Sequence, residues 1–166
     1  SVAEADRWKA GEAPIAAEGL IVERFAEGLD HPRNIYVLPN GDILVAETNA
    51  PANRMKGIEG WIAAKLFEKA GAAVPSANRI TLLRDADGDG KPEVKSTFLE
   101  VLNAPFCMAL IGNILYVANT DAVLAFPYKE GDTKITAKGN KILELNAKAP
   151  NNHWTRNLAA SADGQK

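Results

Sequence analysis

The chain has 166 residues, of which 46% are hydrophobic and 24% charged, with a formal net charge of -2. This length suits one ordinary domain with a sizeable core, and no stretch approaches the run of about 18 apolar residues that a membrane span needs. The scattered lysines and arginines leave no basic patch for nucleic acid, and a single cysteine, Cys107, excludes an internal disulfide framework.

The first 19 residues are rich in alanine and glutamate and show no sustained period. They are predicted to form a lead-in segment on the surface, ahead of a single domain over 20–166. The opening Ser1-Val2-Ala3-Glu4-Ala5 suits the start of a processed exported protein.

From residue 20 onward, short strand-like runs alternate with turns rich in glycine, asparagine, aspartate and proline. The clearest hairpin joins residues 35–38 to 43–46 through Asn40-Gly41, because this dipeptide readily supplies the positive φ angles of a tight turn. Six further runs complete a set of eight predicted strands: 80–83, 94–99, 106–111, 114–118, 123–126 and 141–145. The chain is therefore predicted to be all-β.

One interruption, over residues 51–75, breaks this rhythm. Between Trp61 and Ala70 the apolar residues have helical spacing, and Gly71 follows. This pattern predicts one amphipathic helix inserted between strands. It is expected to pack on the sheet, with a role as a lid or as a partner-binding helix as the alternative.

The strands fall into a repeat. Residues 29–32 (Leu-Asp-His-Pro) match 102–105 (Leu-Asn-Ala-Pro), and residues 45–49 match 117–121. Units of four strands, with an apolar first hairpin and a more polar second one, are typical of propeller blades. The predicted fold is a partial β-propeller.

A third copy of the unit is predicted to start at residues 154–160 and to turn at 161–164. The chain then amounts to about two and a half blades of a ring of about six. Such a chain cannot close a ring, and open blade edges favour aggregation. We therefore expect it to be the N-terminal part of a protein of roughly 400 residues.

An acidic loop follows the third predicted strand. Residues 85–90 read Asp-Ala-Asp-Gly-Asp-Gly, which places Asp85, Asp87 and Asp89 as in the first half of a calcium loop. Position twelve is Ser96 rather than glutamate, so any affinity should be below that of an EF-hand. The equal alternative is a polar hairpin tip in which the aspartates bond to backbone amides.

The chain has two histidines, His31 and His153, which is too few for a zinc cluster. His31 precedes Pro32, where a packing or turn role is the simpler interpretation. His153 lies in a polar, aromatic and basic segment over 151–158, directly before a predicted strand. Loops on a rigid scaffold are common places for sites, and imidazole is well suited to accept a proton at neutral pH.

Three segments resemble, in the same order, parts of the sorbosone dehydrogenase-like family, which is related to the soluble quinoprotein glucose dehydrogenases. They are 28–42 (GLDHPRNIYVLPNGD), 75–90 (PSANRITLLRDADGDG) and 152–158 (NHWTRNL). The resemblance runs from about Ile15 to the end of the chain. It implies a six-bladed, periplasmic or secreted propeller that holds pyrroloquinoline quinone (PQQ) and calcium and oxidises sugars or sugar-derived aldehydes.

The resemblance also implies roles for single residues. His153 would be the general base that removes the substrate proton while hydride passes to the quinone, and Arg156 and Asn157 would line the cofactor pocket. In the family an aspartate or a second histidine commonly precedes this histidine, whereas this chain has Asn152, which cannot supply charge to a protonated imidazole. A binding scaffold without a redox centre and a calcium-dependent lactonase are the alternative functions.

Overall fold

The computed structural model describes residues 9, 11–50, 61–62, 65–66, 69, 75–148, 151 and 153–164. The chain divides into two compact units. One comprises Ser1–Gly28 and Arg54–Pro75, and the other comprises Leu29–Asn53 and Ser76–Lys166. All strands of the described residues belong to the second unit.

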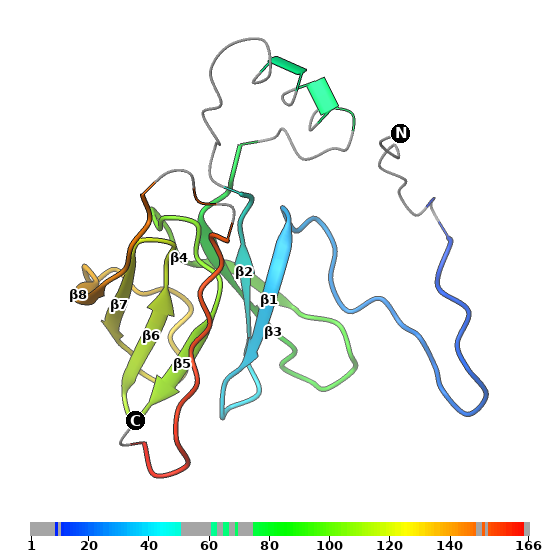
Figure 1. The fold of residues 1–166 in the computed structure, drawn as a ribbon. Coiled ribbons are helices and arrows are strands. Elements are labelled where there is room, and N and C mark those ends of the chain that lie inside the picture. Colours follow the sequence, from blue (N-terminus) through cyan, green and yellow to red (C-terminus); the bar gives the residue numbers. More distant parts are fainter. Residues whose placement is uncertain are drawn as a thin grey trace. The chain divides into compact units, whose positions relative to one another are not determined.

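The described part of the chain contains two four-stranded antiparallel sheets, in each of which strands adjacent in sequence are adjacent in space (Figure 1). The first sheet comprises β1 (Pro32–Val37), β2 (Ile43–Glu47), β3 (Arg79–Arg84) and β4 (Val94–Leu99). The second comprises β5 (Met108–Ile111), β6 (Ile114–Ala118), β7 (Ala122–Pro127) and β8 (Asn140–Glu144). The prediction of an all-β chain with these eight strands is confirmed.

The turn of the first hairpin forms as its sequence predicts. Gly41 has a φ of 88°, which residues with a side chain rarely adopt. Its amide donates a hydrogen bond to the carbonyl of Leu38 at 2.9 Å. The buried carboxylate of Asp42 accepts two hydrogen bonds of 2.7 Å from Arg84. This ion pair ties the turn to the end of β3.

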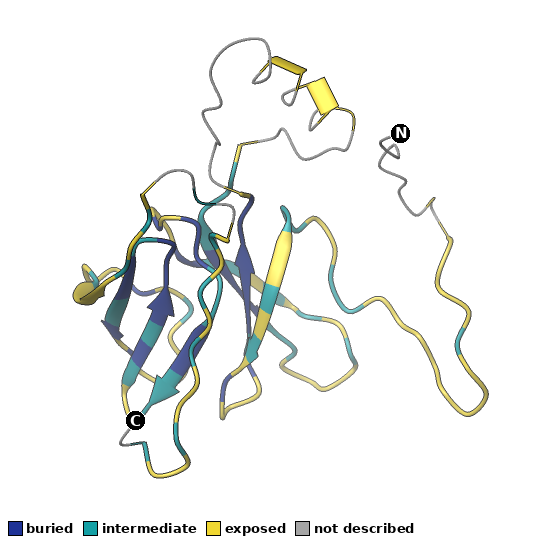
Figure 2. Ribbon diagram, viewed as in Figure 1, coloured by how far each residue is buried: buried dark blue, intermediate teal, exposed yellow. Residues whose placement is uncertain are grey.

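The two sheets share one apolar core. Tyr36, Leu44 and Leu82 stand in register across β1, β2 and β3 on the face that meets the second sheet, and the Tyr36 hydroxyl accepts a hydrogen bond from the Leu110 amide at 3.0 Å. Figure 2 shows that the buried residues concentrate in the middle strands of the sheets, whereas the edge strand β1 is largely exposed. The fully buried core side chains include Leu44, Ile80, Leu82, Phe98, Leu115 and Val117.

The connection between β7 and β8 returns to the first sheet. The Ile135 amide donates to the carbonyl of Phe98 at 2.9 Å, and the Ser96 hydroxyl donates to the carbonyl of Thr133 at 2.7 Å. Backbone and side-chain hydrogen bonds therefore join the two sheets in addition to the core.

The sequence repeat has a structural counterpart at the start of each sheet. His31 and Ala104, the residues before Pro32 and Pro105, have positive φ angles of 51° and 46°. The non-glycine residues of a chain adopt this conformation infrequently. The same uncommon backbone therefore recurs at matching places of the two sheets.

The predicted third copy of the repeat has the same kind of turn as the first hairpin. The Gly164 amide donates to the carbonyl of Ser161 at 2.9 Å, as the Gly41 amide does to Leu38, and both glycines have positive φ. Figure 1 shows the chain after residue 153 running beside β5, and the Cys107 sulfur lies 3.5 Å from the carbonyl oxygen of Leu158. Residues 161–164 thus repeat the turn of the first hairpin, whereas residues 154–160, predicted as the first strand of this copy, form none of the eight strands because no second strand of the copy is there to pair with them.

The predicted inserted helix over 61–70 lies partly outside the described residues. Its five described positions have helical backbone and are exposed: Trp61, Ile62, Lys65, Leu66 and Lys69. The positions between them lie outside the described residues, so the inserted helix stays a prediction. No helix in the described part of the chain has the length and apolar character needed to cross a bilayer.

Val101, two residues after the end of β4, has a strained backbone and an exposed side chain. Its φ is 59°, and 93% of its surface is exposed. The left-handed conformation costs a non-glycine residue about 1–2 kcal/mol, so we expect Val101→Gly to raise the free energy of unfolding by about 0.5–1 kcal/mol in urea denaturation. Val101→Ala keeps the Cβ atom and should change it by less; a less stable glycine variant would contradict the prediction.

Candidate functional site

The two predicted sites lie at opposite ends of the strands. Asn78, directly before β3, accepts hydrogen bonds from the amides of Leu102 and Ala104, both at 3.1 Å. The neighbouring Asn103 carbonyl accepts the amide of Thr120, at the end of β6 where the His153 segment is attached. The acidic loop instead follows the far end of β3, whose length of six residues separates the two ends by about 20 Å.

The acidic loop brings together one more carboxylate than the sequence predicted. Asp85, Asp87, Asp89 and Glu93 each offer an oxygen, and these atoms all lie within 4.8 Å of one another. Hard cations such as Ca²⁺ bind six to eight oxygen ligands, among them carboxylates and water. The four side chains therefore fit part of a calcium site, with Glu93 at position nine of the loop.

The same loop also has the turn geometry of the alternative interpretation. The Asp85 carboxylate accepts the amides of Gly88 at 2.7 Å and Gly90 at 2.9 Å, and Glu93 accepts the amide of Ala86 at 2.6 Å. A carboxylate has about four acceptor sites, so these bonds leave lone pairs for a cation. The two interpretations are compatible, because the turn bonds hold the carboxylates in place.

Calcium is expected to stabilise the folded chain through this loop. At a free concentration of 100 times Kd, it should add about 2.7 kcal/mol to the free energy of unfolding and raise the melting temperature. Asp87→Asn should remove most of this effect, whereas Glu100→Gln, on an exposed residue paired with Lys134, should retain it. The site would be excluded if calorimetry found no heat of calcium binding and a chelator did not change the melting temperature.

His153 is exposed, and the backbone that carries it is fixed by its neighbour. The Trp154 carbonyl accepts the Thr120 hydroxyl at 2.8 Å, and the Trp154 ring meets Phe106 edge to face at 6.4 Å between centroids. The guanidinium of Arg33 lies 5.5 Å from the centre of the same ring. These aromatic and cation–π contacts hold the segment against the sheets.

Arg156 fixes the same segment from the other side. Its guanidinium donates to carbonyl oxygens of Thr120 at 3.2 Å, His153 at 2.6 Å, Thr155 at 3.4 Å and Asn146 at 2.9 Å. In this geometry Arg156 positions the backbone of His153. Asn157 is exposed beside it, and the cofactor contacts predicted for both residues stay predictions.

Sequence reasoning missed a buried ionic cluster at the His153 end. Glu47 is fully buried, and its carboxylate accepts two hydrogen bonds from Arg79, at 3.0 and 2.9 Å, and further ones from the Thr81 hydroxyl and the Asp30 amide. Burial alone would raise the pKa of Glu47, but these hydrogen bonds outweigh it and lower the pKa. The signal available in the sequence was that the apolar run of β2 ends in a charged residue, Glu47.

Neither of two cavities among the described residues is lined by His153, Arg156 or Asn157. One lies on the second sheet, and the other lies against residues 127–137. Comparison with protein-family models, with curated proteins and with solved structures found no significant match. A function for this chain must therefore be inferred from its residues and their geometry.

Proposed function

We propose that the chain forms two blades and the first strand of a third in a β-propeller of about six blades. The parent protein would be a periplasmic or secreted, PQQ-dependent dehydrogenase for sugars or sugar-derived aldehydes. The observation that carries the proposal is the recurrence of a positive φ before each of two four-stranded meanders, together with the glycine turn of the first hairpin, which returns at 161–164.

The order of the layers supports this arrangement. In a propeller, each sheet packs between a preceding and a following one. Leu110 of β5 packs against the core shared with the first sheet, while Ala109 and Ile111 line the opposite face together with Leu158. The second sheet thus has the first sheet on one face and residues 158–160 on the other, an order that a propeller would also have.

The chemistry that the chain itself would supply is proton transfer. PQQ, when bound, would accept the hydride. His153 would accept the proton of the substrate hydroxyl or hydrate, with its backbone carbonyl fixed by Arg156 at 2.6 Å. Its exposure at the strand ends leaves the imidazole accessible to a small substrate.

The described residues do not by themselves fit the whole cofactor. PQQ is a tricarboxylate, and the guanidinium groups near His153 donate to backbone carbonyls: Arg156 as described, and Arg33 to Thr48 at 3.4 Å. The proposal therefore assigns the charged partners of PQQ to the remaining blades.

A spectral titration tests the proposal. Adding PQQ and Ca²⁺ to the full-length propeller should shift the quinone absorbance, and a subsequent sugar aldehyde should reduce the bound quinone. Omitting calcium serves as the control. Sugar binding without a spectral change would favour the binding scaffold, and lactone hydrolysis without quinone would favour the lactonase.

A further inference from the structure

The sequence repeat extends upstream of the first sheet. The match of residues 29–32 with 102–105 continues backward without a gap, so that 21–28 (IVERFAEG) falls on 94–101 (VKSTFLEV). Both octets have phenylalanine at the fifth place and glutamate at the seventh. The first six residues of the second octet are β4, the fourth strand of the first sheet. The first octet therefore carries the sequence of a fourth strand.

The backbone repeats together with this sequence. Gly28 and Val101, which end the two octets, have φ angles of 65° and 59°. A left-handed φ is uncommon for valine, so its recurrence at a matched position is a specific sign. His31 and Ala104 give the second such pair, as described above. The chain after residue 26 thus has the same two left-handed positions as the chain after β4.

The residue that follows a fourth strand has a fixed role in both sheets. The Leu102 amide donates to the carbonyl of Asn78 at 3.1 Å, and the Leu145 amide donates to the carbonyl of Asp121 at 2.7 Å. Each acceptor directly precedes the third strand of its sheet. Leu29 holds the matching place in the sequence, followed like the others by aspartate or asparagine. Three such endings therefore occur, whereas the described residues form two sheets.

The side chains of the first octet suit an outer strand with one buried face. Phe25 falls on Phe98, which is fully buried, and Ile21 falls on Val94, which packs against the core. Residues four apart on a strand point to the same face. In this structure Ile21 is 85% exposed, and residues 21–26 belong to none of the strands that the described residues form. An apolar strand face is thus present without its sheet.

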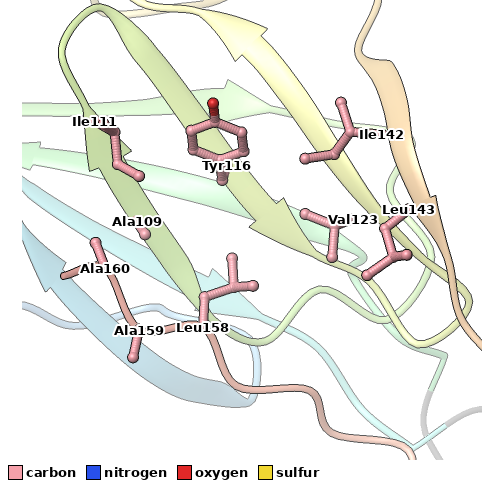
Figure 3. A pocket seen from close by; sticks show the side chains of 9 residues that line it. All are labelled: Ala109, Ile111, Tyr116, Val123, Ile142, Leu143, Leu158, Ala159 and Ala160. Carbon is pink, nitrogen blue, oxygen red and sulfur yellow. The ribbon is translucent and has the colours of Figure 1, made fainter. Parts of the chain in front are cut away.

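The sheet that would take this strand lies outside the described ones. Their fourth places are filled by β4 and β8. The third copy of the repeat reaches only the place of its first strand, where Leu158 and Ala160 lie beside Ala109 and Ile111 of the second sheet (Figure 3). The first three strands of the missing sheet must then come from other residues.

We propose that residues 21–26 form the fourth, outermost strand of a sheet whose first three strands lie in the same polypeptide beyond residue 166. The strand would pair antiparallel with the third strand of that sheet, as β4 pairs with β3. This inference rests on the blade arrangement proposed above. One sheet built from an early and a late segment would close the ring and pair an edge that is otherwise open.

Hydrogen exchange tests this pairing. In the proposed full-length propeller, about half of the amides of residues 21–26 should exchange at least about 100-fold more slowly than in the 166-residue chain, because an edge strand donates every second amide to its neighbour. The amides of β2, in the middle of the first sheet, should be protected in both proteins. Equal exchange of residues 21–26 in the two proteins would overturn the proposal. Protection that appears only where sedimentation shows a doubled mass would also overturn it, since the partner would then be a second copy.

Two substitutions on opposite faces of the strand give a matched pair. Phe25→Ser should lower the melting temperature of the full-length propeller by at least about 5 °C, because a buried aromatic side chain is lost. Val22→Lys should change it by less than about 2 °C, since Val22 falls on the exposed Lys95. Equal shifts for the two variants would contradict the assignment of the faces.

The exchange measurement needs no substitution, so it decides the matter even where the Phe25 variant does not fold. It is also independent of the quinone titration. Protected amides without a quinone signal would remove the redox function and leave the strand in place. A quinone signal with unprotected amides would remove the strand alone.

Discussion

Replacing His153 with alanine is expected to lower the turnover number for sugar-aldehyde oxidation by about 10²- to 10⁴-fold, the usual contribution of a positioned general base. The measurement is the initial rate of the proposed full-length propeller with PQQ and Ca²⁺. KM should change much less than kcat, because the proton moves in the transition state and the imidazole adds little to ground-state binding.

The other histidine provides the matched control. His31 has a φ of 51°, and its ring nitrogen lies 3.0 Å from the Asp30 carboxylate. His31→Asn removes the imidazole while keeping a residue that tolerates the left-handed conformation, so activity should be retained. Undiminished turnover in the His153 variant would defeat the assignment of the base.

Replacing Glu47 with alanine is expected to lower the free energy of unfolding by about 3 kcal/mol, measured by urea denaturation. The substitution leaves the Arg79 guanidinium, the Thr81 hydroxyl and the Asp30 amide without their shared acceptor. Arg79 is about one-third exposed and can regain some hydration, which keeps the loss at the lower end for a buried pair. Glu144→Ala, on an exposed residue paired with Lys141 at 3.6 Å, should cost under about 0.5 kcal/mol.

The pH dependence gives the same cluster a second readout. Because the pKa of Glu47 is lowered in the folded chain, its contribution to stability is present above its ordinary pKa and is lost as the pH falls through the folded value. Glu47→Gln should therefore lose less stability than the unsubstituted chain on acidification below about pH 4.5. Parallel acid denaturation curves would contradict this.

Local signals in the sequence predicted most of the fold. Gly41 marks a turn because the required φ is open to glycine, and eight strands follow from such turns and from the apolar runs between them. The bond between Glu47 and Arg79 joins residues 32 positions apart, so it follows from the antiparallel register of β2 and β3 and from no local pattern. A contact of this kind can be recognised only when the pairing of the strands is known.

The candidate site was predicted less completely, for a related reason. The spacing of Asp85, Asp87 and Asp89 is local and identified the acidic loop, whereas Glu93 joins it only through the curl of the turn. The family resemblance implied a cofactor contact for Arg156. The carbonyls that surround its guanidinium come partly from the distant turn at Thr120 and could not be anticipated from neighbours in sequence.

The acidic loop and His153 lie at opposite ends of the strands, so a stabilising cation at the loop and proton transfer at the imidazole would be separate in space. A cation held at the loop would be too far from the imidazole to polarise a substrate, since its field is weakened by the intervening sheet and by solvent. Changes in the loop could then adjust heat tolerance or resistance to chelators while leaving substrate preference untouched. Natural variation at the two ends should accordingly be free to proceed independently.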